Sequence, residues 1–204
     1  MSAPDRLRPD QLRAALGPVT IGREIVVVEE TPSTNDMVGE MGGNGRKEGV
    51  VVFAEHQTAG RGQRGNKWES AAYKGLWFSM LLRPAIDLKE STRLTEWAAQ
   101  AIASTIRNSY SLPAEIELPN DIYVGNRKVA GVLVEMRAQP RSPHFAVVGI
   151  GLNVNHTQDD FPAELRDRST SLAIESGSQQ DRSELAVALL RNMDRSYGNL
   201  IAGK

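Results

Sequence analysis

Residues 59–68, AGRGQRGNKW, combine three glycines with cations and one large aromatic side chain. Glycine lets a backbone approach an anion closely and leaves its N–H donors free to bind it. Arginine can hold a phosphate or a carboxylate through two parallel hydrogen bonds. The stretch therefore predicts a mobile anion-binding loop, with Arg61, Arg64 and Lys67 as cations and Trp68 as a flat cover for a ring. A solvated basic loop is the plainer interpretation of the composition alone.

The same glycines spell G-x-G-x-x-G, a pattern shared with dinucleotide-binding folds, where it opens a helix. Here NKWESAAYKGLWF follows, which is a poor helix and leads into a strand. The triphosphate-binding loop fails as well, because it requires Gly-Lys-Ser/Thr where this chain has Asn66-Lys67. Both interpretations are excluded.

Three other stretches carry polar or glycine residues where predicted elements begin or end: STN at 33–35, PND at 119–121 and GIGLNVN at 149–155. Lys128 follows the second of these, just past a predicted turn. Each stretch has a structural interpretation, since Ser33 can cap a helix and Asn120-Asp121 can shape a turn. Lys128 can be a solvated hairpin lysine, and the glycines of GIG can mark a bulge.

The elements that must position these residues alternate along the chain. Ser33 and Asp36 form a possible capping box that opens a short helix. Hydrophobic periodicity predicts strands over 24–30, 49–55, 75–84 and 145–155, a hairpin over 121–137 with its turn at Gly125-Asn126, and helices over 91–110 and 183–200. Only 175–183 is loop-like at any length. Hairpins mixed with helices predict an α+β fold, with a mainly antiparallel or mixed sheet flanked by helices.

Composition narrows the class of protein. The 204 residues suit a single domain, and a net charge of −1 argues against nucleic acid as the main partner. The absence of cysteine excludes disulfides and thiolate chemistry, and the three histidines lack metal-ligand spacing. No apolar run approaches a membrane span, and the N-terminus has no secretory signal. We therefore expect a cytoplasmic protein without a membrane or nucleic-acid partner.

Taken together and in order, the motifs resemble one family. STN, then Q-x-x-GRG-x-x-G-x-x-W, then PND with RK-x-AG, then GIG-x-N-x-N is similar to the catalytic domain of biotin protein ligases, from about residue 24 to residue 155. The resemblance implies the α+β fold of class II aminoacyl-tRNA synthetases and biotinyl/lipoyl ligases. It implies ATP- and Mg²⁺-dependent conversion of biotin to biotinyl-5′-AMP. Biotin then passes to a lysine of a biotin carboxyl carrier protein domain.

The resemblance also implies roles for individual residues. The catalytic residues would be Arg61, Lys128 and Asp121, the last also a candidate for the otherwise unknown magnesium ligand. The biotin site would comprise Ser33, Thr34, Asn35, Gln57, Gly60, Arg61, Lys128, Gly131, Leu133 and Gly149. The ATP site would comprise Arg64, Trp68, Asn120 and Asn153. A homodimer is possible on the same grounds.

The sequence departs from the family pattern at three positions. Gln63 and Asn66 stand where arginines are usual, and Glu117 stands where the family has the lysine of KWPND. A carboxylate near the reacting anions would be costly if it were desolvated and cheap if it faced water. We also expect neither the N-terminal DNA-binding domain nor the small C-terminal β-barrel of many members.

Three hypotheses follow from these observations. The first is a working biotin protein ligase. The second is a ligase-like protein that binds biotin or its adenylate without efficient turnover, which the three departures and the expected lack of a barrel favour. The third is a ligase for another small acid such as lipoate or octanoate, and the STN and GIGLNVN motifs favour biotin over it.

Overall fold

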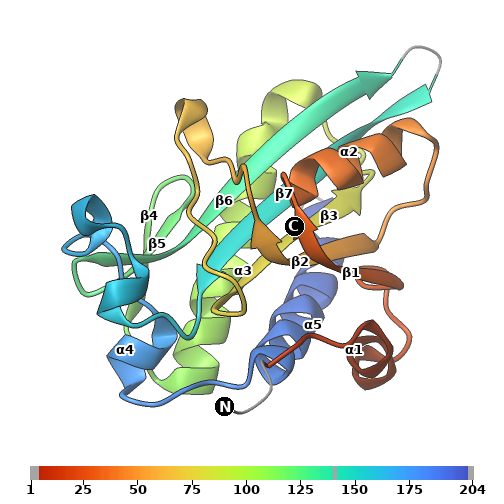
Figure 1. Ribbon diagram of the computed structural model, residues 1–204. Helices are drawn as coiled ribbons and strands as arrows, with labels where there is room; N and C mark the ends of the chain where they lie inside the picture. Colours follow the sequence, from red (N-terminus) through yellow and green to blue (C-terminus); the bar gives the residue numbers. More distant parts are fainter. Residues whose placement is uncertain (1–4, 140–141, 202–204) are drawn as a thin grey trace.

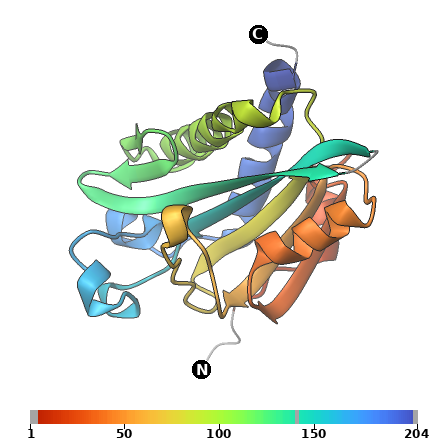
Figure 2. The same cartoon turned by 90° about the horizontal axis from the view of Figure 1, so that it is seen from above.

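The computed structural model describes residues 5–139 and 142–201, which form one mixed sheet with helices on both faces (Figures 1 and 2). The strands are β1 (Glu24–Thr31), β2 (Val50–Gln57), β3 (Gly75–Leu82), β4 (Ala114–Glu117), β5 (Asp121–Val124), β6 (Arg127–Gln139) and β7 (Ser142–Asn153). The helices are α1 (Pro9–Leu16), α2 (Thr34–Gly43), α3 (Ser91–Tyr110), α4 (Leu172–Ser176) and α5 (Arg182–Ile201).

The seven strands lie in the order β1-β2-β3-β7-β6-β5-β4. Only β1 and β2 run parallel, joined by α2, and every other neighbouring pair is antiparallel. The predicted α+β class with a mainly antiparallel sheet is confirmed. The hairpin of β5 and β6 turns at Gly125, whose φ of 60° glycine adopts without strain.

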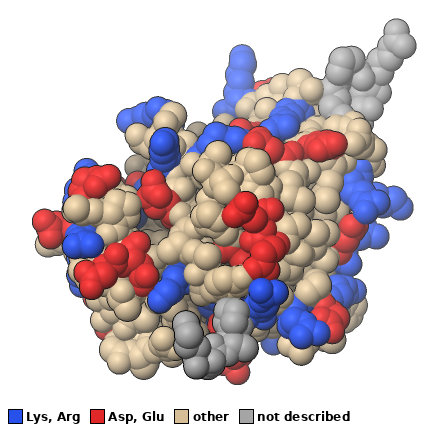
Figure 3. All heavy atoms as spheres, in the orientation of Figure 1, with Lys and Arg blue, Asp and Glu red and all other residues tan. Residues whose placement is uncertain are grey.

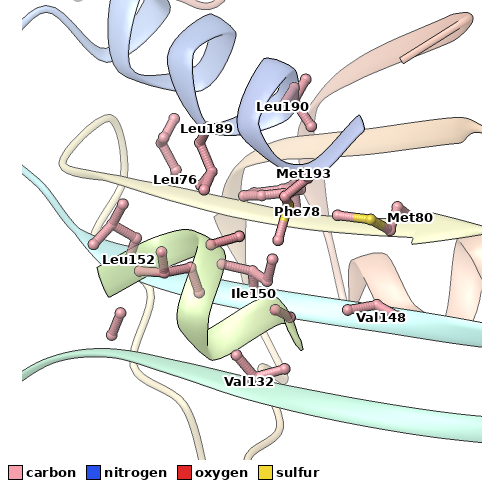
Figure 4. Packing of buried hydrophobic residues seen from close by; sticks show 14 of the residues in the cluster. Leu76, Phe78, Met80, Val132, Val148, Ile150, Leu152, Leu189, Leu190 and Met193 are labelled. Atoms are coloured by element: carbon pink, nitrogen blue, oxygen red, sulfur yellow. The ribbon is translucent and has the colours of Figure 1, made fainter. Parts of the chain in front are cut away.

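The larger core lies between the sheet and helices α3 and α5. Alternate residues of the central strands point into it, and a β-strand sends successive side chains to opposite faces. Figure 4 shows Phe78 and Met80 of β3 packed with Ile150 of β7 below Met193 of α5. Phe53 and Phe78 stack at 4.8 Å between ring centroids, which fixes β2 against β3 in this core.

Helix α2 covers part of the opposite face of the sheet (Figure 2). Val38 of this helix packs in a smaller cluster with Val52 of β2, Leu81 of β3 and Val147 of β7. Because α2 covers only the β2–β3–β7 end of this face, the adjoining surface of β6 and β7 is left for the loop that follows β2. This loop contains the short 3₁₀ turn η1 (Gln63–Gly65) and lies over β6 and β7 (Figures 1 and 2).

A buried ion pair joins the first turn of α5 to β2. The Arg182 guanidinium lies 2.7 Å from a carboxylate oxygen of Glu55, and both side chains are almost fully buried. Arg182 also donates to the carbonyl of Gly75, and Glu55 accepts the backbone N–H of Leu7. The partners satisfy each other's buried charge, and the segment before α1 is held against the end of β2 that leads to the loop.

Three elements were not predicted, namely α1, β4 and α4. Signals for α1 were present, because Pro9 occupies its first turn and Gly17 ends it with a φ of 72°. Strand β4 is only four residues long. It is a strand because it pairs with β5, and no local sequence pattern reveals that pairing. No helix in the described part of the chain is long and apolar enough to cross a membrane.

Candidate active site

A cavity of about 40 Å³ opens on the α2 side of the sheet, beneath the loop that follows β2. Its lining brings together all four motifs: Ser33, Thr34, Asn35, Gln57, Arg61, Gln63, Trp68, Asn120, Asp121, Lys128, Gly131, Leu133, Gly149 and Gly151. These residues are separated by up to 118 positions in the sequence, yet one face of the sheet collects them. A volume of this size has room for only a few water molecules.

The floor of the cavity requires glycine because other side chains occupy the space that a Cβ would need. A Cβ at Gly149 would lie 2.1 Å from Oδ1 of Asn35, and one at Gly151 would lie 2.2 Å from Cε2 of Trp68. Neither glycine has the left-handed conformation that glycine favours. Gly149 therefore admits a polar side chain from α2, and Gly151 admits the indole from the loop.

A chain of buried hydrogen bonds lies at one end of the cavity. Gln57 Oε1 accepts from both the backbone N–H and the hydroxyl of Thr34, at 2.9 and 3.1 Å. The hydroxyls of Thr34 and Ser79 lie 2.7 Å apart, and that of Ser79 donates to Asn35 Oδ1 at 2.6 Å. The Asn35 amide in turn donates to Glu135 at 3.0 Å. Groups satisfied in this way are held in fixed orientations, which suits recognition of a polar ring.

The predicted capping box of α2 is not formed. Ser33 occupies the N-cap position with extended backbone, but its hydroxyl makes no capping hydrogen bond and the residue lines the cavity instead. Asp36 accepts two hydrogen bonds of 2.7 Å from Arg61 of the loop. This hydrogen-bonded guanidinium lowers the pKa of the Asp36 carboxyl below its ordinary value, and Asp36 raises the pKa of Arg61. Tertiary contact with a cation replaced the local cap that the sequence favoured.

Lys128 and Asp121 form the charged centre of the cavity. The Lys128 ammonium lies 2.7 Å from Oδ1 of Asp121, and the Asn120 amide donates to the same oxygen at 2.6 Å. The ammonium also lies 5.4 Å from the ring centroid of Trp68, within range of a cation–π contact. The indole N–H of Trp68 is buried without a hydrogen-bond partner, which costs about 1–3 kcal/mol and which a ligand acceptor would recover.

A second cavity of about 110 Å³ adjoins the first on the far side of Trp68 and Lys128. Its walls are completed by Lys67, Glu69, Asn153, Phe161, Leu165 and Ser169. The Asn153 amide donates to the carbonyl of Thr170 at 3.0 Å, so this asparagine also holds the segment before α4 in place. The cavity therefore combines two lysines and one glutamate with two aromatic side chains and a fixed amide.

His156 supports the wall of this second cavity from beneath. Its ring stacks on Phe161 at 4.9 Å and meets the edge of Trp77 at 5.6 Å. Burial lowers the pKa of His156 to about 4, against a smaller opposing influence of Asp160, so the ring is neutral at pH 7. Its Nδ1 atom has no hydrogen-bond partner. The side chain thus serves as an aromatic support and not as a cation.

Two residues expected in the site, Gly60 and Arg64, do not line either cavity. Gly60 is buried at the base of the loop, where a Cβ would lie 2.4 Å from the carbonyl oxygen of Trp68. Arg64 is exposed in η1 with a φ of 57° and lines neither cavity. Of the departures from the family pattern, Gln63 lines the first cavity whereas Asn66 is exposed.

Glu117 lies outside both cavities. It is exposed at the end of β4 and lines a separate surface hollow. Burial, followed by a hydrogen bond to Glu117, raises the pKa of the Tyr123 hydroxyl. The carboxylate therefore faces water and a tyrosine, and the expected repulsion of the reacting anions is small.

Sequence reasoning missed three polar residues around the first cavity, namely Ser79, Glu135 and Asp36 in its pairing role. Two of these had a usable signal. Glu135 follows Gly131 and Leu133 at intervals of two, which places all three on one face of a strand. Ser79 interrupts the otherwise apolar run GLWFSMLL, and a buried hydroxyl needs a partner. The partner of Asp36 could not be found, because it depends on how the loop folds back.

Charges of both signs are interspersed over the face of the molecule seen in Figure 3, and neither sign covers it. Among residues 5–139 and 142–201, no cluster of three or more His, Asp or Glu side chains could hold a metal ion. The charged side chains at the first cavity form local contacts, Lys128 with Asp121 and Arg61 with both Asp36 and Glu135.

Comparison with known proteins agrees with this geometry. The chain is 35% identical over 194 residues to the bifunctional ligase/repressor BirA of Bacillus spizizenii, covering 95% of this chain and 60% of the relative. It is 34% identical over 207 residues to the biotin–[acetyl-CoA-carboxylase] ligase of Mycobacterium tuberculosis, covering 95% of this chain and 73% of that one. The chain thus spans about 60% of the length of the Bacillus relative.

Among solved structures, the biotin protein ligase of Aquifex aeolicus in complex with biotin and ATP superposes with a TM-score of 0.76 at 29% identity. The match covers 88% of this chain and 72% of that one. Residues 27–153, which include every residue that lines the first cavity, match the biotin/lipoate A/B protein ligase family. The chain belongs to this family.

Proposed function

We propose that this chain is the catalytic part of a biotin protein ligase. In the first half-reaction, a biotin carboxylate oxygen attacks the α-phosphorus of ATP, forming biotinyl-5′-AMP as pyrophosphate leaves. In the second, a lysine amine of a biotin carboxyl carrier domain attacks the acyl carbon, and AMP leaves. The observation that carries the proposal is the convergence of the Thr34–Gln57 hydrogen bonds, the glycine floor and the Lys128–Asp121 pair in one cavity.

The hydrogen-bonded end of the cavity would take the biotin head group. A ureido ring offers one carbonyl acceptor and two N–H donors, and the side chains of Ser33, Thr34 and Gln57 can supply both kinds of partner. Asn35 would fix this end through its bonds to Ser79 and Glu135. The walls formed by Gly131, Leu133 and Gly149 would contact the apolar part of the ligand.

Lys128 would neutralise the two anions that must meet. The biotin carboxylate and the α-phosphate repel each other. A fixed ammonium between them, in a site that excludes water, lowers that repulsion more than the same charge would in water. Asp121 would hold the ammonium in place through the 2.7 Å contact until substrate enters. The orphan indole N–H of Trp68 would gain an acceptor on the ligand.

The second cavity would hold the nucleotide. Trp68 and Phe161 would supply aromatic contacts for a base, Asn153 also lines the wall, and Lys67 would supply charge for phosphate. Mg²⁺ would arrive with ATP, because magnesium in such sites is bound largely by phosphate oxygens with one or two carboxylates. Asp121 is the candidate carboxylate, and a homodimer stays a prediction.

The glycine loop would exclude water once the adenylate has formed. The acyl-adenylate is a reactive anhydride, so hydrolysis must be prevented until the acceptor lysine arrives. The loop already lies over the cavity. The cavity volume of about 40 Å³ is well below the 300–1,000 Å³ typical of ligand sites. Ligand entry therefore requires the loop to lift, and retention requires it to return.

The test is biotin-dependent exchange between ATP and labelled pyrophosphate on the folded protein. Lys128→Ala should lower the exchange rate about 100-fold or more, the loss typical of a stabilising charge at the reacting atoms. The exposed Lys89→Ala in the distant turn η2 (Leu88–Glu90) is the matched control and should leave the rate unchanged. Full activity of Lys128→Ala would remove the role proposed for it, and exchange supported equally by lipoate would identify a different acid as substrate.

A second candidate is a protein that binds biotin or its adenylate without efficient turnover. One observation favours it: Arg64 faces solvent, Arg61 is paired with Asp36, and Gln63 stands at the cavity, so Lys128 is the main cation there. Calorimetric binding of biotin in the absence of pyrophosphate exchange would establish this alternative.

A further inference from the structure

The pairing of Arg61 with Asp36 uses the whole fork of the arginine. Nη1 donates to Oδ2 and Nη2 donates to Oδ1, both at 2.7 Å. Glu135 lies 3.7 Å from Nη2 on the other side. A guanidinium held in this way has both terminal nitrogens directed at protein carboxylates, so the fork with which arginine grips a phosphate is already occupied.

Arg61 stands at the base of the loop. Its backbone pairs with Lys67 in an isolated antiparallel bridge, and the N–H of Trp68 donates to the carbonyl of Gly60 at 3.0 Å. These contacts close the two arms of the loop, so the side chain of Arg61 leaves from the closed end. Whatever holds that side chain also holds the position of the whole loop, including Trp68.

Asp36 stands in the first turn of α2, directly after Ser33, Thr34 and Asn35. The same turn therefore carries the proposed head-group contacts and the anchor for the loop. Glu135 links the head-group contacts to the loop anchor, because it accepts a hydrogen bond from Asn35 at 3.0 Å and lies 3.7 Å from Arg61. A displacement of the loop base would be transmitted to Asn35, and a shift of Asn35 would be transmitted to the loop.

We propose that Asp36 is a positioning residue that anchors the loop to α2 through Arg61, so that the Arg61 side chain acts on the loop and not on the substrate anions. The role of Asp36 in ordering the loop rests only on its contacts with Arg61. The consequence for catalysis rests on the proposed function, because an unanchored loop would retain the ligand poorly and expose it to water.

Amide hydrogen exchange of residues 59–68 in the ligand-free protein tests the anchor without reference to any reaction. Asp36→Asn should speed exchange about threefold to fivefold, the range expected for a partly exposed ion pair. Asp36→Glu keeps the charge and should retain most of the protection. Asp10→Asn removes an acid from the first turn of α1 and is the control for a general helix-dipole effect, with no change expected in the loop.

A charge swap separates anchoring from substrate contact. Arg61→Asp alone and Asp36→Arg alone should each speed exchange in the loop, and the double variant Asp36→Arg/Arg61→Asp should restore protection. In a functional assay the double variant should also recover the KM for biotin relative to either single variant. A guanidinium that binds substrate directly could not be replaced by one placed at position 36.

Two results would overturn the proposal. The first is unchanged loop exchange in Asp36→Asn. The second is a double variant that restores loop protection without restoring KM, because Arg61 would then contact the ligand itself. If neither the wild-type protein nor any variant activates biotin, the proposed function fails. The amide hydrogen exchange data would still show whether Asp36 anchors the loop.

Discussion

The two faces of β3 and β7 are built from alternate residues of the same strands, yet they have opposite properties. Toward α3 and α5, Phe78 and Ile150 present large apolar side chains that are almost completely buried. Toward α2 and the loop, their neighbours Ser79 and Gly149 present a hydroxyl and no side chain at all. One face has packed volume, and the other has space and hydrogen-bonding groups.

The difference shows how one sheet can supply both stability and a site. Strand geometry sends successive residues to opposite faces, so each strand can satisfy both requirements independently. The glycines that would weaken an isolated strand lie in β7, which is hydrogen-bonded to β3 on one side and β6 on the other. The position of β7 inside the sheet compensates for the missing side chains. The glycines in turn let Asn35 and Trp68 approach the strand closely.

Phe78→Ala should produce the largest effect on stability. Phe78 is 1% exposed and stacks on Phe53, so truncation removes buried aromatic volume and should cost about 3–5 kcal/mol of unfolding free energy. Denaturant unfolding measures this loss. The matched variant on the other face, Ser79→Ala, should cost only about 1–2 kcal/mol while weakening biotin binding. Equal losses of stability would mean that the two faces are not functionally divided.

His156 should make the site side of the sheet sensitive to acid. The pKa of His156 is lowered to about 4 in the folded protein from about 6.5 in the unfolded chain. Above pH 6.5 the ring is neutral in both states, so its protonation takes nothing from the free energy of unfolding. As the pH falls from about 6.5 to about 4, the unfolded chain binds the proton first and folding should lose about 3 kcal/mol. Lys74 and Asp160 are the charged groups that influence this ring.

The contribution of His156 is isolated by comparing unfolding free energies with His156→Gln between pH 7 and pH 4. The wild-type curve should fall more steeply, since the variant has no ring to protonate. The carboxylates titrate in both proteins and cancel in the difference. Parallel curves would show that the imidazole is protonated as easily inside the fold as outside it.

Glu117→Lys should have the smallest effect of the three. The side chain is exposed at the end of the edge strand β4 and lies outside both cavities. Unfolding free energy should change by less than about 0.5 kcal/mol, as at other exposed positions, and pyrophosphate exchange should stay within about twofold. A severalfold rise in exchange would instead show that the carboxylate reaches the reacting anions.

The family resemblance carried by the ordered motifs assigned Ser33, Gln57, Lys128 and Gly149 to one site. The structure places these four residues around one cavity. Arg64 was assigned to the ATP site, but it is exposed and lines neither cavity, because a spacing of three in a glycine-rich loop does not reveal where a side chain points. The different environments of Arg61 and Arg64 arise from the φ of 57° at Arg64 and from the contact of Arg61 with α2.

The sequence by itself determined the alternation of the strands, the hairpin turn at Gly125 and the residue types available to the site, because these depend on local periodicity and local backbone freedom. Tertiary structure alone decided the partners of the charges. Asp36 could cap its own helix or bind a distant cation, and the bidentate contact with Arg61 prevailed because the loop brought that cation within 2.7 Å. Glu117 could repel the substrates or face water, and its place at the end of an edge strand decided for water.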